Sequence, residues 1–450
     1  MTSLASPPDT GTFDVLDPST GEVIETLPVG DVDAAVAAAR AAFPAWARTA
    51  PADRAAALKA GARRLREHVE ELAELQTREG GKPLDDSRGG VEAGIGAIEQ
   101  YAELGPLHRG RALQGGWDAV DVMRYEPRGV VALLVPWNDP VAIACGQIAA
   151  ALVTGNAVVF KPSEKTPLTG ARIVELLDIP GALQLLQGDA RVGRPLAAHA
   201  DVDLVMHTGS VQTGREIADV VAKRFGKALL ELGGKDALIV DADVDPEWAA
   251  QQAALGAFAN AGQICTSVER IYVHKDVAEP FIAALAKAAD EWTIGPLINE
   301  RQRRLVHDHV TDALERGARL VRGGAVPDGP GFFYPPTVLV GGDRDAPLLR
   351  DETFGPVAAV QVVDSFDTAL ELADRTEYGL AATVLTKNPA HAQRAARELQ
   401  VGTVKINAVF GGAPGGAAEP ARLSGSGFGY GPELLDELTR TKVVHMGIAP

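Results

Sequence analysis

The sequence predicts an α/β protein with two doubly wound, Rossmann-like domains, and three observations support this. Short apolar strands alternate with helical stretches from residue 129 onward, which is typical of parallel sheets covered on both faces. The 450 residues exceed what one hydrophobic core usually holds, so two or three domains are expected. The apolar share of 46% and the charged share of 23% are those of an ordinary globular protein.

The N-terminal part predicts strands and then a helical layer. Residues 12–28 favour strands around a turn at 17–21, and residues 31–104 show apolar positions at helical spacing. Pro51 and the break at 80–83 divide this helical stretch. Its residues predict packing and no chemistry.

The first α/β run predicts one parallel sheet. Strands are expected at 129–136, 157–160, 182–186, 203–206 and 227–231, and helices at 141–152, 193–199 and 211–225. Such a sheet is a common nucleotide-binding architecture, although a fold alone does not fix a function. A domain boundary is most plausible after residue 235.

The second α/β run predicts another sheet. Strands are expected at 237–240, 270–274, 337–340, 357–363, 380–386 and 403–407, and helices at 246–261, 277–291, 300–316 and 367–374. The segment 113–125 reads as an extended hairpin. A glycine- and proline-rich tail at 411–431 precedes residues 434–438 and a final strand at 441–446.

The totals exclude several classes of function. A net charge of −17 opposes binding to nucleic-acid phosphates or anionic lipid. The only two cysteines, Cys145 and Cys265, cannot form a disulfide framework, so a cytoplasmic protein is expected, and no signal peptide is visible. Residues 141–160 are uncharged and long enough to span a bilayer, but the turn-like 154–156 favours a buried helix followed by a strand.

Cys265 is the first candidate for chemistry. It follows a helical pattern and precedes the small polar pair Thr266 and Ser267, as an exposed nucleophile would. The alternative is a buried small hydrophobe, which is the usual state of a free cysteine. Cys145 lies within a predicted buried helix.

Two strand ends suggest a nucleotide site. Thr208, Gly209 and Ser210 stand before a helix, where backbone N–H groups bind phosphate, although Ser210 is equally a helix N-cap. Lys161 and Glu164 end another strand of the same sheet and could hold a ribose or form a loop salt bridge.

Two further residues suit acid–base or oxyanion chemistry. Glu231 lies between two leucines, where burial would raise the pKa of its carboxyl toward the range of a general base. The alternative is a structural carboxylate that is buried together with its hydrogen-bond or ion-pair partners. Asn138 stands near a helix start, where its amide could hold an oxyanion or cap the helix.

Together, these motifs resemble the aldehyde dehydrogenase superfamily over nearly the whole chain. The motifs that carry the resemblance are 135–140 (VPWNDP), 161–164 (KPSE), 208–210 (TGS), 230–235 (LELGGK), 262–265 (GQIC), 352–357 (ETFGPV), 378–380 (YGL) and 424–431 (SGSGFGYG). The resemblance implies a hydrolytic enzyme, in which Cys265 attacks the aldehyde, Asn138 holds the oxyanion and Glu231 activates water against the thioester.

The resemblance also implies a nicotinamide cofactor. The residues expected to bind it are Pro136, Trp137, Lys161, Glu164, Gly193, Thr208, Gly209, Ser210, Thr213, Leu232, Glu352 and Phe354. Glu164 favours NAD, with NADP possible, because a carboxylate near the ribose 2′ position repels a phosphate. No metal site is expected.

The expected substrate pocket departs from relatives of this superfamily. Its residues are Asp139, Ile143, Gly146, Ile264 and Thr266. Asp139 replaces an apolar residue and the following helix has no arginine, so neutral or amine-bearing aldehydes are expected to fit better than acidic semialdehydes. The loop before Gly295 is shorter than in relatives and the tail at 414–422 is altered, and in this superfamily that tail shapes the mouth of the substrate tunnel.

Three alternatives stay open. They are a succinate-semialdehyde-type dehydrogenase, a coenzyme A-acylating enzyme, which Glu231 argues against, and a non-catalytic binding or structural protein on the same fold.

The predicted domains follow the same resemblance. The cofactor domain is expected at 1–112 and 128–235, and the catalytic domain at 236–409. Residues 113–127 and 410–450 are expected to form a small β element that bridges subunits into a homodimer or a dimer of dimers.

Overall fold

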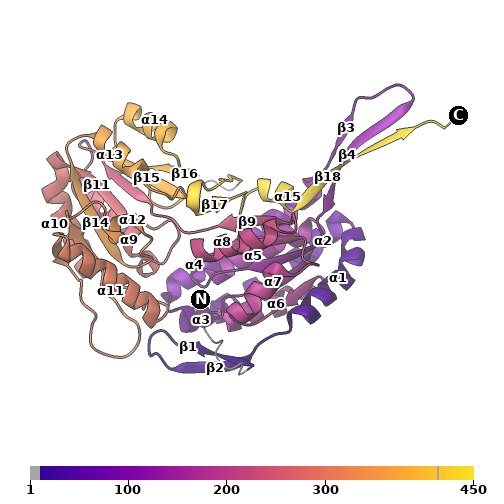
Figure 1. The fold of residues 1–450 in the computed structure, drawn as a ribbon, viewed down its shortest axis with the longest axis horizontal. Helices are drawn as coiled ribbons and strands as arrows, with labels where there is room; N and C mark the ends of the chain where they lie inside the picture. The colour runs from indigo at the N-terminus through magenta and orange to yellow at the C-terminus, as the bar shows by residue number, and fades with distance from the viewer. Residues whose placement is uncertain (1–10, 413–414, 450) are drawn as a thin grey trace.

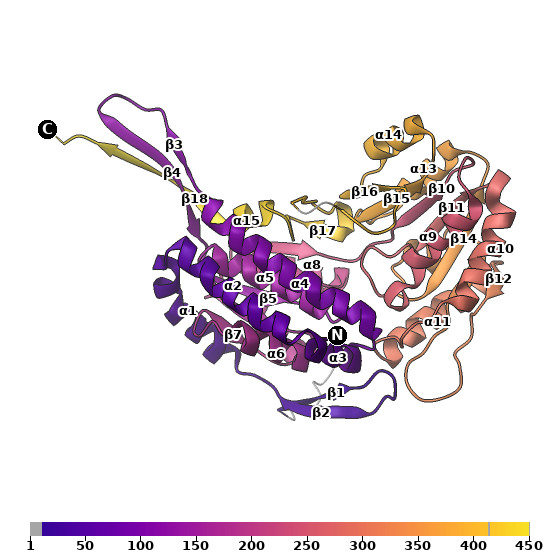
Figure 2. The same cartoon turned by 180° about the vertical axis from the view of Figure 1, so that it is seen from behind.

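The computed structural model describes residues 11–412 and 415–449. It has two large sheets, each covered by helices, and a β arm that projects from the domain of the first sheet (Figures 1 and 2). The chain therefore has the α/β class and the two layered domains that the sequence predicts.

The N-terminal hairpin and four helices precede the first sheet. They are β1 (Thr12–Leu16), β2 (Val23–Pro28), α1 (Val32–Arg48), α2 (Pro51–Glu67), α3 (Val69–Gly80) and α4 (Leu84–Leu104). The Asp31 carboxylate caps α1 by accepting the Ala34 N–H at 3.0 Å. Gly81, with φ 74°, ends α3 in the left-handed conformation that glycine adopts without strain.

The first sheet has the strand order β17-β9-β8-β5-β6-β7. Its parallel strands are β5 (Val130–Leu134), β6 (Ala157–Lys161), β7 (Leu183–Leu185), β8 (Leu204–Thr208) and β9 (Lys227–Glu231). Its crossover helices are α5 (Pro140–Val153), α6 (Pro167–Leu177), α7 (Ala190–Ala198) and α8 (Val211–Ala222). Helix α6 was not among the predicted elements.

Two cores cover the faces of this sheet. Helices α2, α4 and α5 bury leucine, isoleucine and alanine against one face, and α1, α7 and α8 cover the other. Every residue of β5 and β6 is buried, which explains why these strands read as continuous apolar runs.

The second sheet has the order β12-β13-β14-β11-β10-β15-β16. Its strands are β10 (Ala237–Val240), β11 (Arg270–His274), β12 (Arg319–Arg322), β13 (Thr337–Val340), β14 (Val357–Val363), β15 (Ala381–Leu385) and β16 (Thr403–Ile406). Its helices are α9 (Pro246–Phe258), α10 (Lys275–Glu291), α11 (Glu300–Glu315), α12 (Pro347–Arg350), α13 (Phe366–Asp374) and α14 (Pro389–Glu398). The sequence did not predict β12, α12 or α14.

The C-terminal segment returns to the first domain. Its elements are β17 (Gly425–Ser426), α15 (Glu433–Glu437) and β18 (Thr439–Gly447). Strand β17 pairs antiparallel with β9, and β18 joins β4 (Ala119–Pro127) and β3 (Arg111–Leu113) in the arm (Figure 1). The tail therefore contributes both to the first sheet and to the arm.

The long uncharged run forms no membrane span. Residues 141–160 form most of α5, a turn and the start of β6, and no described helix is long and apolar enough to cross a bilayer.

Candidate active site

Cys265 lies in a tight turn between α9 and β11. The helix ends at Phe258 rather than at the predicted Ala261, because Asn260 and Ala261 have φ of 49° and 54°, which a continuing helix cannot adopt. The Ser267 N–H donates to the Ile264 carbonyl at 2.9 Å and closes the turn around the thiol. Cys265 is half-buried at the amino end of the second sheet.

The Cys265 thiol is surrounded by acidic groups. Burial raises its pKa to about 12, and the carboxyl groups of Asp236, Glu231 and Glu352 add to this, while Lys405 opposes it. The thiol is thus protonated near neutral pH and requires a base to become a nucleophile. Cys145 is fully buried in α5, as predicted for a structural cysteine.

Glu231 stands at the carboxyl end of β9 and faces the tail. Its Oε1 accepts the Gly429 N–H at 2.9 Å, and a side chain at Gly429 would collide with it. Burial raises the pKa of Glu231 to about 7. A pKa in this range suits proton transfer near neutral pH, and the Gly429 N–H also gives the carboxyl the interior partner of the alternative interpretation.

The Asn138 side chain is fixed by the loop that carries Cys265. Its Nδ2 donates to the Gln263 carbonyl at 3.1 Å, and the Asn260 amide donates to the Asn138 carbonyl at 3.2 Å. An amide has two N–H donors, so one remains for an oxyanion. The N-cap alternative for Asn138 is wrong, because α5 begins at Pro140 and Asp139 holds the cap position.

Gln263 and Asn260 are functional neighbours that the sequence did not reveal. The Gln263 Oε1 also accepts the Ile298 N–H at 2.9 Å, so this glutamine ties the Cys265 loop to the short segment after Gly295. The left-handed φ of Asn260 fits the residue type, but its partner lies 122 positions earlier in the chain.

The residues expected to bind adenosine and pyrophosphate meet at the carboxyl edge of the first sheet. The register aligns Lys161 of β6, Leu134 of β5 and His207 of β8 in one row. The Lys161 ammonium donates to the Pro162 carbonyl at 2.8 Å. Gly193 lies beside this row, since a Cβ added at Gly193 would lie 3.5 Å from the Lys161 Cε.

The N-cap foreseen for Ser210 is present, whereas the loop salt bridge of Glu164 is made with Lys165 and not with the buried Lys161. Ser210 caps α8 by accepting the Thr213 N–H at 3.3 Å, and Glu164 lies 3.6 Å from the Lys165 ammonium. The Ser210 contact takes one N–H of the first turn of α8, that of Thr213, and the helix terminus keeps the positive dipole that favours an anion.

The other expected cofactor residues lie between this edge and Cys265. Trp137 and Phe354 pack edge to face with ring centroids 5.6 Å apart. Leu232 is buried against Gly214, and Pro136 precedes Trp137 at the exit from β5. Glu352 accepts the Gly234 N–H at 3.1 Å, and its pKa is raised to about 8, mainly by burial. These residues fit a dinucleotide laid from α8 toward Cys265.

The expected pocket residue Asp139 has a partner that the sequence did not suggest. Its Oδ1 lies 3.1 Å from the ammonium of Lys82, which is itself buried at the break between α3 and α4. A Cβ at Gly90 of α4 would lie 2.5 Å from the same oxygen. Glycine at position 90 therefore leaves space for this ion pair.

The remaining pocket residues are small or half-buried. A Cβ at Gly146 would lie 3.6 Å from Ala97 and 4.0 Å from Tyr101, so a large side chain there would meet α4. Ile143, Ile264 and Thr266 are half-buried, the last two on either side of Cys265. The short loop before Gly295 lies against the Gly81 carbonyl, next to Lys82.

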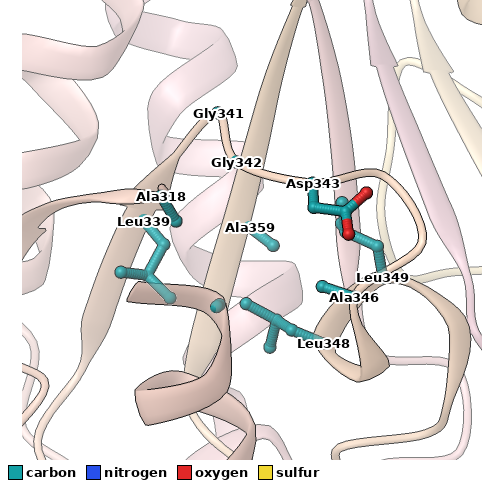
Figure 3. Close-up of a pocket in the computed structure, with 10 residues that line it drawn as sticks. Ala318, Leu339, Gly341, Gly342, Asp343, Ala346, Leu348, Leu349 and Ala359 are labelled. Carbon is teal, nitrogen blue, oxygen red and sulfur yellow. The ribbon is translucent and has the colours of Figure 1, made fainter. Parts of the chain in front are cut away.

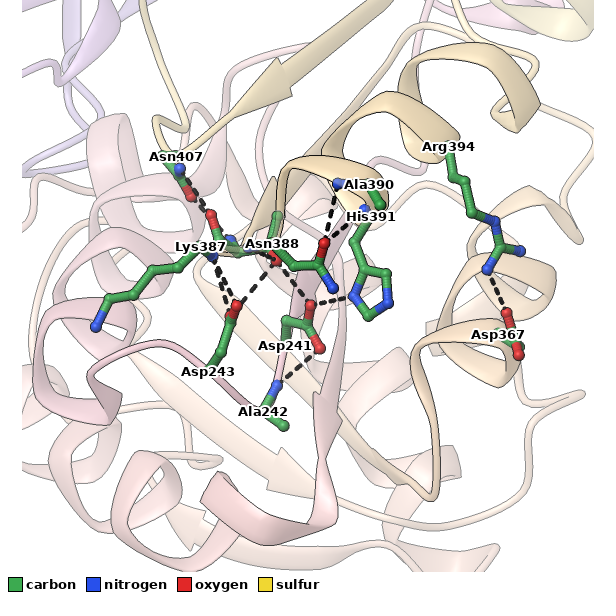
Figure 4. A network of polar contacts seen from close by, with 11 residues as sticks. Asp241, Ala242, Asp243, Asp367, Lys387, Asn388, Ala390, His391, Arg394 and Asn407 are labelled. Atoms are coloured by element: carbon green, nitrogen blue, oxygen red, sulfur yellow. Dashed lines mark hydrogen bonds and ion pairs between the residues drawn. The ribbon is translucent and has the colours of Figure 1, made fainter.

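The site occupies the amino edge of the second sheet, and a polar network occupies the opposite edge. There, Asp241 accepts hydrogen bonds from Thr386 at 2.7 Å and pairs with His391 at 2.6 Å, and Asp243 accepts the Lys387 N–H (Figure 4). His391 stacks on Phe366 with centroids 4.0 Å apart. These side chains satisfy one another and join β10, β15 and α14.

A small cavity lies away from both regions. It has a volume of about 10 Å³ between α11, α12 and β13, room for about one water molecule (Figure 3). Mostly alanine, leucine and glycine line it, and Asp343 stands at its rim. It takes no part in the site.

Comparison with known proteins identifies close relatives of this arrangement. Residues 6–444 match the model of the aldehyde dehydrogenase family. The chain is 37% identical to a betaine aldehyde dehydrogenase of Cereibacter sphaeroides, covering 97% of this chain and 94% of that protein. It is 36% identical to betaine aldehyde dehydrogenase 1 of Rhizobium meliloti, covering 96% and 93%.

Solved structures agree with it over nearly their whole length. A lactaldehyde dehydrogenase superposes with a TM-score of 0.95 at 32% identity, covering 98% of this chain and 97% of that chain. A betaine aldehyde dehydrogenase from Staphylococcus aureus in complex with NAD⁺ also gives 0.95, at 33% identity and with coverage of 99% and 94%.

Proposed function

Because the chain belongs to the aldehyde dehydrogenase family, and is therefore an NAD(P)-dependent aldehyde oxidoreductase, we propose that it forms a carboxylic acid through a thioester on Cys265. The observation that carries this proposal is the placement of Glu231, with a pKa of about 7, close enough to Cys265 to raise the pKa of the thiol. A base and a nucleophile thus share one half-buried site.

The residues divide the reaction between them. Cys265 gives up its proton to solvent water and attacks the aldehyde carbon as a thiolate, and the free N–H of the Asn138 amide stabilises the resulting oxyanion. The bound nicotinamide supplies the hydride acceptor that converts the adduct to a thioester. Glu231 then takes a proton from water, the hydroxide adds to the acyl carbon and displaces the Cys265 thiolate as the acid is released, and the proton held by Glu231 passes to the sulfur.

The cofactor is held, in this proposal, along the edge from α8 to Glu352. Ser210 and the first turn of α8 bind the pyrophosphate, Lys161 and Glu164 the adenosine ribose, and Glu352 the nicotinamide ribose. Glu164 disfavours a 2′-phosphate, so NAD is preferred over NADP. Comparable rates with both cofactors would remove this preference.

We propose an amine-bearing aldehyde as the substrate class, with neutral aldehydes next. In the ion pair, the Lys82 ammonium neutralises the charge of the Asp139 carboxylate. The Asp86 carboxyl stands close enough to both groups for their charges to affect its pKa, although burial is the main cause that raises this pKa. The three groups leave an excess of negative charge. The relatives named betaine aldehyde dehydrogenase agree with a cationic substrate.

The arm supports an oligomer. Exposed apolar residues line its strands and the end of the chain, namely Leu113, Val120, Val443, Met446 and Ile448. We propose that a second copy of the chain covers this sheet, in a dimer or a dimer of dimers, and that the protein with its two free thiols works in the cytoplasm.

The test is NADH formation over a panel of cationic, neutral and acidic aldehydes. Betaine aldehyde, propionaldehyde and succinate semialdehyde represent the three classes, Cys265→Ala serves as the inactive control, and Glu231→Gln should lose steady-state turnover. We expect the highest kcat/KM with the cation. Highest efficiency with succinate semialdehyde would overturn the substrate proposal, and acyl-coenzyme A formation on adding coenzyme A would overturn hydrolysis.

A further inference from the structure

His207 is a buried histidine that the proposed chemistry does not use. It stands near the carboxyl end of β8, one residue before Thr208, and only 8% of its surface is exposed. Neither ring nitrogen has a hydrogen-bond partner among the residues that the structure describes. Buried polar atoms are normally paired, because an unpaired one has lost its hydrogen bonds to water without gaining others.

The ring lies at the edge where the cofactor is proposed to bind. His207 is in register with Leu134, whose other cross-strand neighbour is Lys161, so the imidazole and the ammonium belong to the same row on the face covered by α7 and α8. The Leu134 carbonyl lies close enough to favour a protonated ring but does not complete a hydrogen bond.

One edge of the ring faces the start of α8. A Cβ added at Gly209 would lie 2.6 Å from the His207 Cε1 and 2.8 Å from its Nε2, so only glycine lets the backbone pass over this edge. The next residue, Ser210, caps α8, a helix of 12 residues whose first N–H groups attract anions.

We propose that His207 binds the pyrophosphate of the dinucleotide, donating a ring N–H to a phosphate oxygen at the N-terminus of α8. This inference rests on the proposed function, because it assigns a further ligand to the proposed cofactor site. Burial, with Lys161 adding to it, lowers the pKa of His207 to about 4. The ring is therefore neutral at pH 7, with one donor and one acceptor to offer.

A ring that only filled space would behave differently. Phenylalanine has nearly the same shape and would remove two unpaired polar atoms from a buried position, so it would leave ligand binding unchanged or improve it. A ring that donates to phosphate would lose affinity for pyrophosphate ligands alone, and a glutamine would restore part of it through its own N–H.

The experiment measures the Kd of wild type, His207→Phe and His207→Gln for ADP and for adenosine by calorimetry at pH 7.5. We expect His207→Phe to weaken ADP binding about tenfold, a loss of the size of one hydrogen bond to a charged group, and to leave adenosine unchanged. His207→Gln should recover at least half of that loss on a logarithmic scale. His199→Phe, at the far end of α7, is the matched control and should bind ADP as wild type does.

A second measurement uses the unaltered protein. The imidazole ¹⁵N signals of His207 are identified as those that are missing from the spectrum of His207→Gln. Adding ADP to the wild type should shift these signals, and adding adenosine should not. Unchanged ADP affinity in His207→Phe, an equal loss for ADP and adenosine, or unshifted signals would overturn the role of His207. Failure of wild type to bind NAD or to form NADH would instead overturn the proposed function.

Discussion

The Asp139 carboxylate and the Lys82 ammonium lie 3.1 Å apart, and Lys82 comes from a helix break 57 positions earlier in the chain. The pair stands next to Asn138, which is itself fixed by the Cys265 loop. The charge beside Asn138 is therefore set by this pair together with Asp86, and not by Asp139 alone.

Removing the lysine should sharpen selectivity for cations. In Lys82→Met, Asp139 keeps its charge without a partner, so we expect KM for betaine aldehyde to fall several-fold relative to KM for propionaldehyde. Asp139→Asn should move this ratio in the opposite direction. Steady-state kinetics on both aldehydes measures the ratio, and an unchanged ratio in both variants would exclude the pair from substrate recognition.

Glu231→Gln should stop turnover after the first thioester is formed, before any acid is released. Without a base for water, we expect steady-state kcat to fall about 10²–10⁴-fold, while a burst of NADH close to one equivalent per site remains. In the wild type the base is active when ionised, so kcat limited by hydrolysis should rise with pH through about 7. Stopped-flow absorbance and a pH profile check both; a variant with no burst would assign Glu231 to an earlier step.

The buried carboxyl groups around Cys265 should make the protein less stable at higher pH. The pKa of Asp236 is raised to about 8, mainly by burial, and one of its oxygens has no partner in the described part of the chain. Glu352 and Glu231 are raised to about 8 and 7. A carboxyl whose pKa is higher in the folded state than in the unfolded state stabilises the fold at low pH, where it is protonated. This stabilisation is lost as pH rises toward 8.

Denaturant unfolding at pH 5.5 and 8.5 tests this dependence. We expect Asp236→Asn to flatten the decline, because the amide mimics the protonated carboxyl and does not titrate. Asp364→Asn, an exposed position paired with Lys275, is the control and should leave the slope unchanged. A steeper decline in Asp236→Asn than in the wild type would contradict the assignment.

The network at the far edge of the second sheet should affect stability and not catalysis. Burial opposes ionisation of Asp241, but hydrogen bonds from His391, Thr386 and Ala242 hold its pKa below the usual value. Its contribution is thus present at neutral pH and lost as pH falls through that lowered pKa. We expect Asp241→Ala to cost about 1–3 kcal/mol of unfolding free energy and to leave kcat/KM unchanged.

The arm should control assembly. Val443 is 65% exposed on β18, and Val443→Asp adds a charge to a surface that a second copy is proposed to cover. We expect light scattering after gel filtration to show a smaller species than in the wild type. Arg440 is exposed on the same strand, and Arg440→Asp tests whether any new acidic charge there reduces the size of the assembly.

Much of the fold follows from local patterns, and the family resemblance is confirmed. The fully buried strands β5 and β6 are visible as apolar runs, and the motifs single out Cys265, Glu231 and Asn138 as candidates. Helix α14 was missed because Ala395 is its only buried residue, which leaves no apolar periodicity to detect. Strand β12 was missed for the same reason, since it has no buried residue.

The contacts that refine the site could not be predicted from the sequence. The bonds from Asn138 to Gln263 and from Lys82 to Asp139 join segments far apart in the chain, and local propensity does not encode such pairs. Asp139 alone suggested a free negative charge, and the partner that changes this interpretation became visible only after folding. Positions of departure from a family motif are therefore where tertiary contacts matter most.

The pairing of β17 with β9 has a consequence for the order in which the protein is made. A ribosome delivers the chain from its N-terminus, and residues 237–406 of the second sheet emerge before Gly425 and Ser426 can reach the first sheet. Until then, the outer edge of β9 is unpaired and open to other chains, and Glu231 lacks the Gly429 N–H. The domain that begins first is thus completed last, and a nascent chain stalled before residue 425 carries an exposed sheet edge beside an unfinished active site.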